Sequence, residues 1–393
     1  MKIAKGLIPF LLLIFAVSMV IGCSHTDKTD VKEVITNELD LLKNLDSDTA
    51  QKYIPYKELF PDATEKTELS KEVEEVFSLF FQDFDYKILR VSVDQNKKEA
   101  AASLKLTTID AQALAKDYAV AHLKEAILAA ADSASQNTEE NSCSLEDRYL
   151  ILNELLKNNK YETVKRDCSI TLAQTGTDRE KWEIKRTHDL ENDLVGGLIA
   201  YLSDSDLLTP EETLTVYLNT LKTMDVDQMS NYLGLESLLT TSDNAKNSIA
   251  SALVEQVHKN FDFKILDSEI QSYQATVNAE ITTFDSNAIL DAYQKELEDY
   301  LASPDAVIDG AQKRYNHSLE LLLKNIEENT GTLSHPAAFS LINDGVSWKL
   351  QNDGTAIGTG IFGTLSSTPV SEESQEESQE EAPEDDSTEE TQE

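Results

Sequence analysis

The chain has 393 residues and carries 34 Lys and Arg against 72 Asp and Glu, which gives a formal net charge of −38. Such an acidic chain lacks the basic face that nucleic-acid binding or direct docking on anionic lipid requires, so both functions are disfavoured. The chain is long enough for two domains of ordinary size.

The first residues predict a secretory leader and a lipid anchor. Two lysines precede the apolar run "GLIPFLLLIFAVSMVIG", which is short for a permanent transmembrane helix. It ends in "VIGC" (20–23), typical of a bacterial lipobox, so residues 1–22 are predicted to be a lipoprotein signal peptide and Cys23 the acylated N-terminus. Several acyl chains, palmitate among them, hold a protein firmly at a bilayer. We therefore expect residues 23–30 to tether the protein to the extracytoplasmic face of the cell membrane.

A first repeat is predicted over residues 31–204. Apolar residues recur at helical spacing in "VKEVITNELDLLKNL" and "LSKEVEEVFSLFFQDF", with a short helix capped by Asp46 between them. The segments "FDYKILRVSVD" and "EAAASLKLTTI" alternate apolar and polar residues around the turn "QNKK", which is typical of an antiparallel hairpin. A helical segment from Asp110 to Lys160 follows, and a second strand pair ends at Trp182.

A second repeat, over residues 208–365, follows the same order. "LKNLDSDTAQKYI" is matched by "LKTMDVDQMSNYL", "FDYKIL" by "FDFKIL", "TTIDAQALAKDY" by "TTFDSNAILDAY", and Trp182 by Trp348. The period is far longer than the roughly 20 to 50 residues of a solenoid unit, so each copy is a whole domain. Helices before and between antiparallel hairpins predict an α+β fold: two tandem homologous domains, each with N-terminal helices, an antiparallel sheet and an inserted helical segment.

This plan, with its Asp-x-Asp turns ("LDSD", "MDVD") and strands that end in "EKWEIK" and "VSWKLQ", resembles lipoproteins of Gram-positive bacteria with tandem nuclear-transport-factor-like domains. The resemblance implies a curved sheet wrapped around helices to form a cone with a cavity, a fold that serves enzymes and non-catalytic binders alike. The inserted helical segment departs from that pattern. Residues 366–393 form an acidic tail with almost no apolar residue, which predicts disorder.

Metal, cofactor and redox signals are weak. No histidine lies at ligand spacing to another, so no metal is expected. The Asp-x-Asp pairs lack the other ligands of a calcium loop and are interpreted as helix caps. "GTGIFG" (358–363) has no acidic partner in a folded segment after it, so no dinucleotide cofactor is expected and a terminal strand is predicted instead. Cys143 and Cys168 could form a disulfide, or Cys168 could be a free buried thiol.

Six aromatic side chains are candidates for a ligand pocket or, as we prefer, for core packing: Phe84, Tyr86, Trp182, Phe261, Phe263 and Trp348. No serine lies in a nucleophile elbow and neither Cys143 nor Cys168 has an activating histidine nearby in sequence, so the chain is not expected to be an enzyme. The preferred hypothesis is a non-catalytic binding or scaffolding lipoprotein of the cell envelope, with a protein partner or a small ligand. The alternatives are an envelope hydrolase or isomerase that uses a domain cavity, and the solute-binding receptor of a transporter.

Overall fold

The computed structural model describes residues 25–64, 70–94, 96–133, 144–175, 181–235, 244–363 and 365. The predicted signal peptide, the predicted lipidation site Cys23 and the acidic tail lie outside these residues. The chain divides into two compact units: the first comprises Met1–Leu114 and Cys143–Tyr201, and the second Ala115–Ser142 and Leu202–Glu393. None of the described helices is both long and apolar enough to cross a membrane.

The boundary between the units falls after residue 201, close to the predicted boundary between residues 204 and 208. The division of the residues inside the first repeat differs from the prediction. Residues 115–142, which the sequence places in repeat 1, belong to the second unit. The reason is packing, because Ile127 and Ala131 are buried in the hydrophobic core of that unit. In addition, the Lys116 ammonium lies 2.9 Å from the Glu212 carboxylate.

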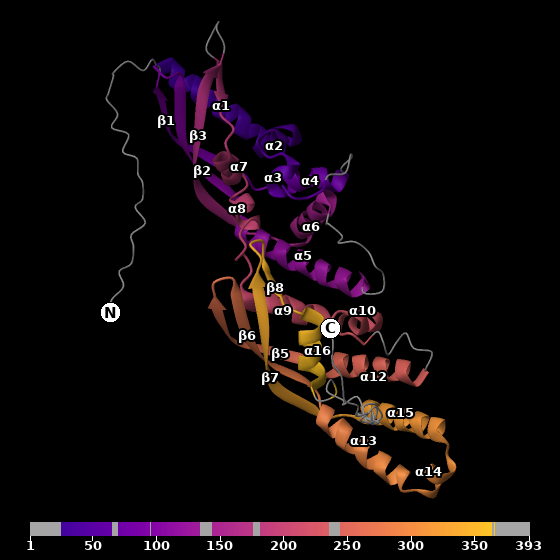
Figure 1. The fold of residues 1–393 in the computed structure, drawn as a ribbon. Coiled ribbons are helices and arrows are strands. Elements are labelled where there is room, and N and C mark those ends of the chain that lie inside the picture. Colours follow the sequence, from indigo (N-terminus) through magenta and orange to yellow (C-terminus); the bar gives the residue numbers. More distant parts are fainter. Residues whose placement is uncertain are drawn as a thin grey trace, which may run out of the picture. The chain divides into compact units, whose positions relative to one another are not determined.

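The first unit contains helices on one side of a four-stranded sheet (Figure 1). Its elements are α1 (His25–Lys43), α2 (Ser47–Tyr53), α3 (Tyr56–Leu59), α4 (Lys71–Phe80), β1 (Asp85–Asp94), β2 (Glu99–Ile109), the start of α5 (Ala111–Ser133), α6 (Leu145–Asn158), β3 (Thr163–Thr175), β4 (Lys181–Ile184), α7 (His188–Leu194) and α8 (Leu198–Leu202). The strand order is β1-β2-β3-β4, and each neighbouring pair is antiparallel.

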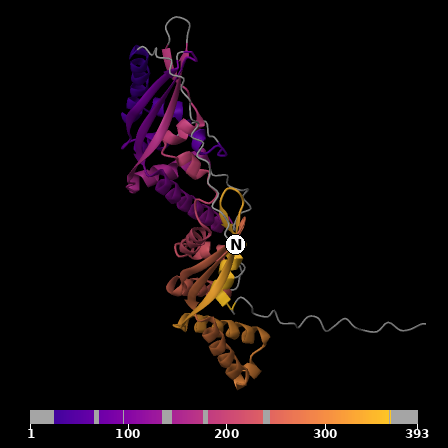
Figure 2. The ribbon, with the colours of Figure 1, turned by 90° about the vertical axis from the view of Figure 1, so that its left-hand side faces the viewer.

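The second unit repeats this plan. Its elements are the rest of α5 with α9 (Pro210–Leu221), α10 (Val226–Tyr232), α12 (Asn244–Asn260), β5 (Asp262–Gln271), β6 (Gln274–Phe284), α13 (Ser286–Leu301), α14 (Pro304–Ile308), α15 (Ala311–Glu328), β7 (Thr332–Asn343), β8 (Trp348–Leu350) and α16 (Asp353–Phe362). The antiparallel order is β5-β6-β7-β8. Helices α13 and α15 form a hairpin that extends beyond the end of this sheet (Figure 1, Figure 2). The prediction of tandem α+β domains is confirmed.

The two first strands share a small irregularity. In β1 the pairing with β2 shifts between Ile88 and Arg90, and in β5 the pairing with β6 shifts between Ile265 and Asp267. A bulge of this kind places one extra residue on one strand and bends it. The sequences "FDYKIL" and "FDFKIL" are therefore equivalent bulged edge strands.

Helix caps predicted from the sequence are confirmed in both units. The Asp46 carboxylate accepts a hydrogen bond from the Thr49 amide at 2.8 Å, and the matching Asp225 accepts one from the Gln228 amide at 2.9 Å. Asp110 and Asp285 cap α5 and α13 in the same way. Each carboxylate satisfies an amide of the first helical turn that has no partner within the helix.

The prediction of a terminal strand over 358–363 was wrong, because this segment belongs to helix α16. Its glycines allow close packing rather than bends. A Cβ on Gly354 would lie 2.0 Å from the carbonyl oxygen of Tyr232, and Gly358 lies over the carbonyl of Leu233. The helix can approach the backbone of its neighbour only because these positions lack side chains.

Replacing Asp225 by Ala should lower the free energy of unfolding by about 1 kcal/mol, because the Gln228 amide loses its acceptor. Urea unfolding of the full chain, followed by circular dichroism, measures this loss. Asp227→Ala is the control, since it removes an exposed acid from the same helical turn but leaves the cap in place. Equal losses in the two variants would contradict the capping role.

A candidate charged site in the first unit

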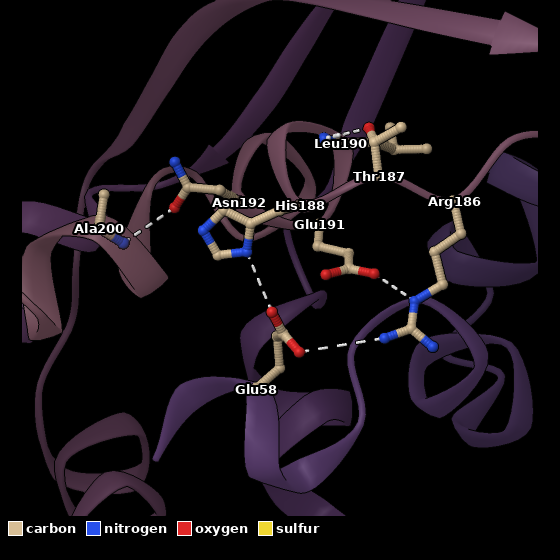
Figure 3. Close-up of polar contacts among 8 residues, drawn as sticks. All are labelled: Glu58, Arg186, Thr187, His188, Leu190, Glu191, Asn192 and Ala200. Carbon is tan, nitrogen blue, oxygen red and sulfur yellow. Dashed lines mark hydrogen bonds and ion pairs between the residues drawn. The ribbon is translucent and has the colours of Figure 1, made fainter. Parts of the chain in front are cut away.

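Charged side chains from two distant segments meet at the surface of the first unit. Glu58 lies on α3, whereas Arg186, His188 and Glu191 come from the end of the sheet and the start of α7 (Figure 3). His188 and Glu191 are three residues apart on one helix, so their side chains lie on the same face. This cluster of Glu58, Arg186, His188 and Glu191 is called the charged site below.

Local hydrogen bonds fix the helix that carries two of these residues. The Thr187 hydroxyl accepts a hydrogen bond from the Leu190 amide at 3.2 Å and so caps α7. The Asn192 side-chain oxygen accepts one from the Ala200 amide at 3.0 Å, which joins α7 to α8 (Figure 3). The orientation of His188 and Glu191 is therefore set by backbone contacts on both sides of α7.

The geometry of the charged site is a chain of close polar contacts. His188 Nδ1 lies 3.0 Å from Glu58 Oε1, and because an ionised carboxylate can only accept, the imidazole donates. The Arg186 guanidinium donates through Nε to Glu191 Oε1, and its Nη2 lies 4.0 Å from Glu58 Oε2. Figure 3 shows Glu58 between His188 and Arg186.

Burial differs sharply among these groups. The side chain of Glu191 is only 6% exposed, that of Glu58 is 28% exposed, and those of Arg186 and His188 are 45% and 67% exposed. A buried carboxylate is costly unless a cation or several donors compensate it. Arg186 supplies that cation here, so the site is a partly buried carboxylate held by a solvent-exposed counter-ion.

Sequence reasoning missed this site. The spacing of the histidines gives no sign of it, because His188 meets a glutamate 130 residues away in the sequence. The one local signal is "THDLE" (187–191), in which a capping Thr precedes a His and a Glu three residues apart. That pattern indicates two side chains on one helical face, but it cannot indicate Glu58.

Replacing Arg186 by Ala should destabilise the first unit by about 1 to 2 kcal/mol, since the buried Glu191 loses its cation while solvent already screens part of the ion pair. Chemical unfolding monitored by circular dichroism tests this. Arg90→Ala removes an exposed arginine from β1 and should leave stability nearly unchanged. A loss for Arg90→Ala as large as for Arg186→Ala would contradict the assignment.

The aromatic residues singled out in the sequence are mostly core. Phe84, Trp182, Phe261 and Trp348 are all buried, whereas Tyr86 and Phe263 are half-buried. Phe84 lies 5.4 Å from Phe81 between ring centroids, in an edge-to-face contact. The Trp348 indole donates a hydrogen bond to Asp206 at 2.8 Å. These contacts are those of packed interiors.

One hydroxyl distinguishes the two first strands. The Tyr86 hydroxyl donates to Asp40 Oδ1 at 2.7 Å, whereas Phe263 has no such group at the matching place in β5. Partial burial and the neighbouring Asp40 carboxylate raise the pKa of Tyr86 to about 12, so the hydroxyl is protonated at neutral pH. The contact joins β1 to α1, which is a structural role.

Tyr86→Phe should therefore cost about 1 kcal/mol of unfolding free energy, because it removes a hydrogen bond to a charged but partly exposed group. The control is a double-mutant cycle with Asp40→Asn. This substitution should lower the free energy of unfolding much less when Tyr86→Phe is already present. Additive effects in the cycle would show that the two side chains do not interact.

Cys168 is a buried free thiol, and Cys143 and Cys23 lie outside the described residues. Burial and the nearby Asp193 carboxylate raise the pKa of Cys168 to about 12. A thiol with a pKa so far above neutrality is a poor nucleophile, since the thiolate is the reactive form. Cys168 is therefore part of the core of the first unit.

Each unit contains a hollow among its described residues. In the first unit an apolar cavity of about 10 Å³ is lined by side chains such as Phe77, Phe80 and Leu152, which is room for roughly one water molecule. In the second unit an open polar depression of about 300 Å³ lies on α12 between Ser248 and Glu255. None of the six candidate aromatics lines either one.

The chain matches no protein-family model and no curated protein. Among solved structures it is similar to a protein of Bacillus subtilis described as a "putative lipoprotein (ycdA)". The two chains are 11% identical, the match covers 71% of this chain and 96% of the other, and the TM-score is 0.25. Two structures with so low a score superpose poorly, so the function proposed below rests on the residues of this chain.

Proposed function

We propose that the protein is a membrane-tethered lipoprotein on the extracytoplasmic face of the cell, and that it acts without catalysis by binding another protein of the envelope. The "VIGC" sequence at 20–23 supports the tether, because it is typical of a lipobox, in which the cysteine is acylated and becomes the start of the mature chain. The interior of the first unit supports a surface function, because the apolar cavity described there has room for about one water.

The observation that carries the proposal is an apolar hairpin tip on the second unit, which we define as residues 301–315, from the end of α13 through α14 to the start of α15. Val307 and Ile308 are 82% and 81% exposed, Leu301 is 52% exposed and Tyr315 is 42% exposed. Single exposed aliphatic residues are common, but several in one short segment are typical of contact surfaces. The hairpin places this tip away from its sheet (Figure 1, Figure 2).

Polar contacts hold the tip in shape behind these side chains. The Arg314 guanidinium donates to the carbonyl oxygens of Ala306 at 3.1 Å and Asp309 at 2.9 Å. The Tyr300 hydroxyl donates to the Asp309 carboxylate at 2.9 Å, and Ser303 caps α14. A partner that binds an already ordered tip loses less conformational entropy than one that must order it.

The charges around the tip suggest the chemistry of its partner. Asp305 and Asp309 flank the exposed Val307 and Ile308, Lys313 lies 3.4 Å from Asp309, and the whole chain is strongly acidic. Acidic groups beside the apolar pair disfavour insertion into an anionic bilayer, and the net charge disfavours a second copy of the chain. The partner that fits is a protein with an apolar depression surrounded by Lys or Arg side chains.

The two alternatives have less support. An enzyme would need a carboxylate and a histidine in a cavity, but Glu58 and His188 do not line the apolar cavity of the first unit. A solute receptor, or the cone implied by nuclear-transport-factor-like domains, needs a space for its ligand. The apolar cavity is far smaller than the roughly 300 Å³ or more of ligand pockets, and the depression on α12 is open and polar.

Photocrosslinking in living cells tests the proposal. A photoreactive amino acid at Val307 should give an adduct with one distinct envelope protein, and Ile308→Asp in the same chain should abolish it. The control position is Val346, which is 73% exposed in the turn between β7 and β8 of the same unit. Adducts with lipid and wall polymer alone, or the same adducts from Val307 and Val346, would contradict the proposal.

A further inference from the structure

The charged site has a second property that goes beyond protein binding: it gathers three side chains that ligate metal ions. One ligand atom from each of Glu58, His188 and Glu191 lies within 4.8 Å of the other two. Ligands of a zinc ion lie about 2.0 to 2.2 Å from the metal, hence about 3 to 4 Å from one another. Small side-chain rotations would therefore bring these atoms to ligand distances.

We infer that Glu58, His188 and Glu191 form a binding site for a divalent transition metal ion of the zinc class, and that Arg186 is the competing cation built into the same site. One imidazole nitrogen and two carboxylate oxygens suit Zn²⁺, Co²⁺ and Mn²⁺ rather than the soft Cu(I), which prefers sulfur. Three protein ligands leave further coordination positions to water.

The supporting contacts hold the ligands in place before any metal binds. His188 and Glu191 lie on the capped first turn of α7. On the other side, the Tyr149 hydroxyl donates to the carbonyl oxygen of Tyr56 at 2.8 Å, which fixes the start of α3 and so the position of Glu58. A site on fixed elements loses little entropy when the ion binds.

The charge balance explains why Arg186 and a metal would compete. Two carboxylates and a neutral imidazole carry two negative charges, and one guanidinium compensates only one of them. A divalent ion compensates both, and it would bind the same Glu191 carboxylate whose Oε1 Arg186 contacts. The side chain of Arg186 is 45% exposed and its Nη2 is 4.0 Å from Glu58, so it can turn into solvent without crossing the core.

This competition gives the site a signature that loose binding to surface carboxylates lacks. Removing a ligand must weaken metal binding, whereas removing Arg186 must strengthen it. An acidic chain binds divalent ions weakly at many places, and none of those places would respond to these four residues in opposite directions.

The test uses the detergent-solubilised full chain and Co²⁺, whose visible absorption reports nitrogen and oxygen ligation, with Zn²⁺ as the displacing ion. His188→Ala and Glu191→Gln should each weaken Co²⁺ binding by about tenfold or more. Arg186→Gln should strengthen it severalfold. His317→Ala is the matched control, because His317 lies 3.5 Å from Glu320 but belongs to no group of three potential ligands among the described residues, and it should leave binding unchanged.

Circular dichroism shows whether each variant folds. If Arg186→Gln does not fold without metal, the comparison of His188→Ala and Glu191→Gln with His317→Ala decides the question. Equal Co²⁺ affinity in all variants would overturn the proposal and assign the bound ion to scattered carboxylates. Weaker binding by a folded Arg186→Gln chain would overturn the competing role of the arginine.

Discussion

The buried face of the second strand of each sheet is the constraint on which each unit depends. β2 and β6 each have a strand on both sides, and their alternate residues point into the core. The residues that form this face are Ala102, Leu104 and Leu106 in one unit and Val277, Ala279 and Ile281 in the other. Removing such a face from water contributes about 25 cal/mol for each Å² of apolar surface, so the helices must cover it. With that face covered, sites open to a partner or an ion lie on the surface.

The contacts that recur in both units stabilise the fold. The Lys43 ammonium lies 2.7 Å from Asp85 at the start of β1, and Lys222 lies 2.8 Å from Asp262 at the start of β5. The same strand carries the same bulge in both copies, and the same helices begin at an aspartate. What the duplication preserved is therefore the means of holding a first strand to a first helix, which explains why "FDYKIL" and "FDFKIL" look like a motif.

The sequence predicted those parts of the fold that depend on neighbours along the chain. Strand alternation in "EAAASLKLTTI" and the caps at Asp46 and Asp225 are local signals, and each was confirmed. Features that depend on distant contacts were missed. Ile127 is an apolar residue of α5, but its neighbours in the sequence do not indicate which unit's core will bury it. The glycines of α16 are also typical of strands and loops, and the sequence does not indicate that the carbonyl of Tyr232 lies against Gly354. Likewise, nothing in the sequence pairs Glu58 with His188.

The segment after the last strand shows how far the two copies have diverged. After Trp348 it forms α16, whose apolar face is buried in the core, and Ile357 stands there at the same distance from Trp348 as Glu191 from Trp182. After Trp182 it forms α7, which carries the charged site. The second unit builds the same four-stranded sheet with an isoleucine at that position, so the sheet does not require the glutamate. Burying a carboxylate costs free energy that an apolar side chain does not, and Arg186 offsets only part of that cost. A function other than folding, such as the binding of an ion, therefore better explains why a glutamate is present at position 191 with these partners.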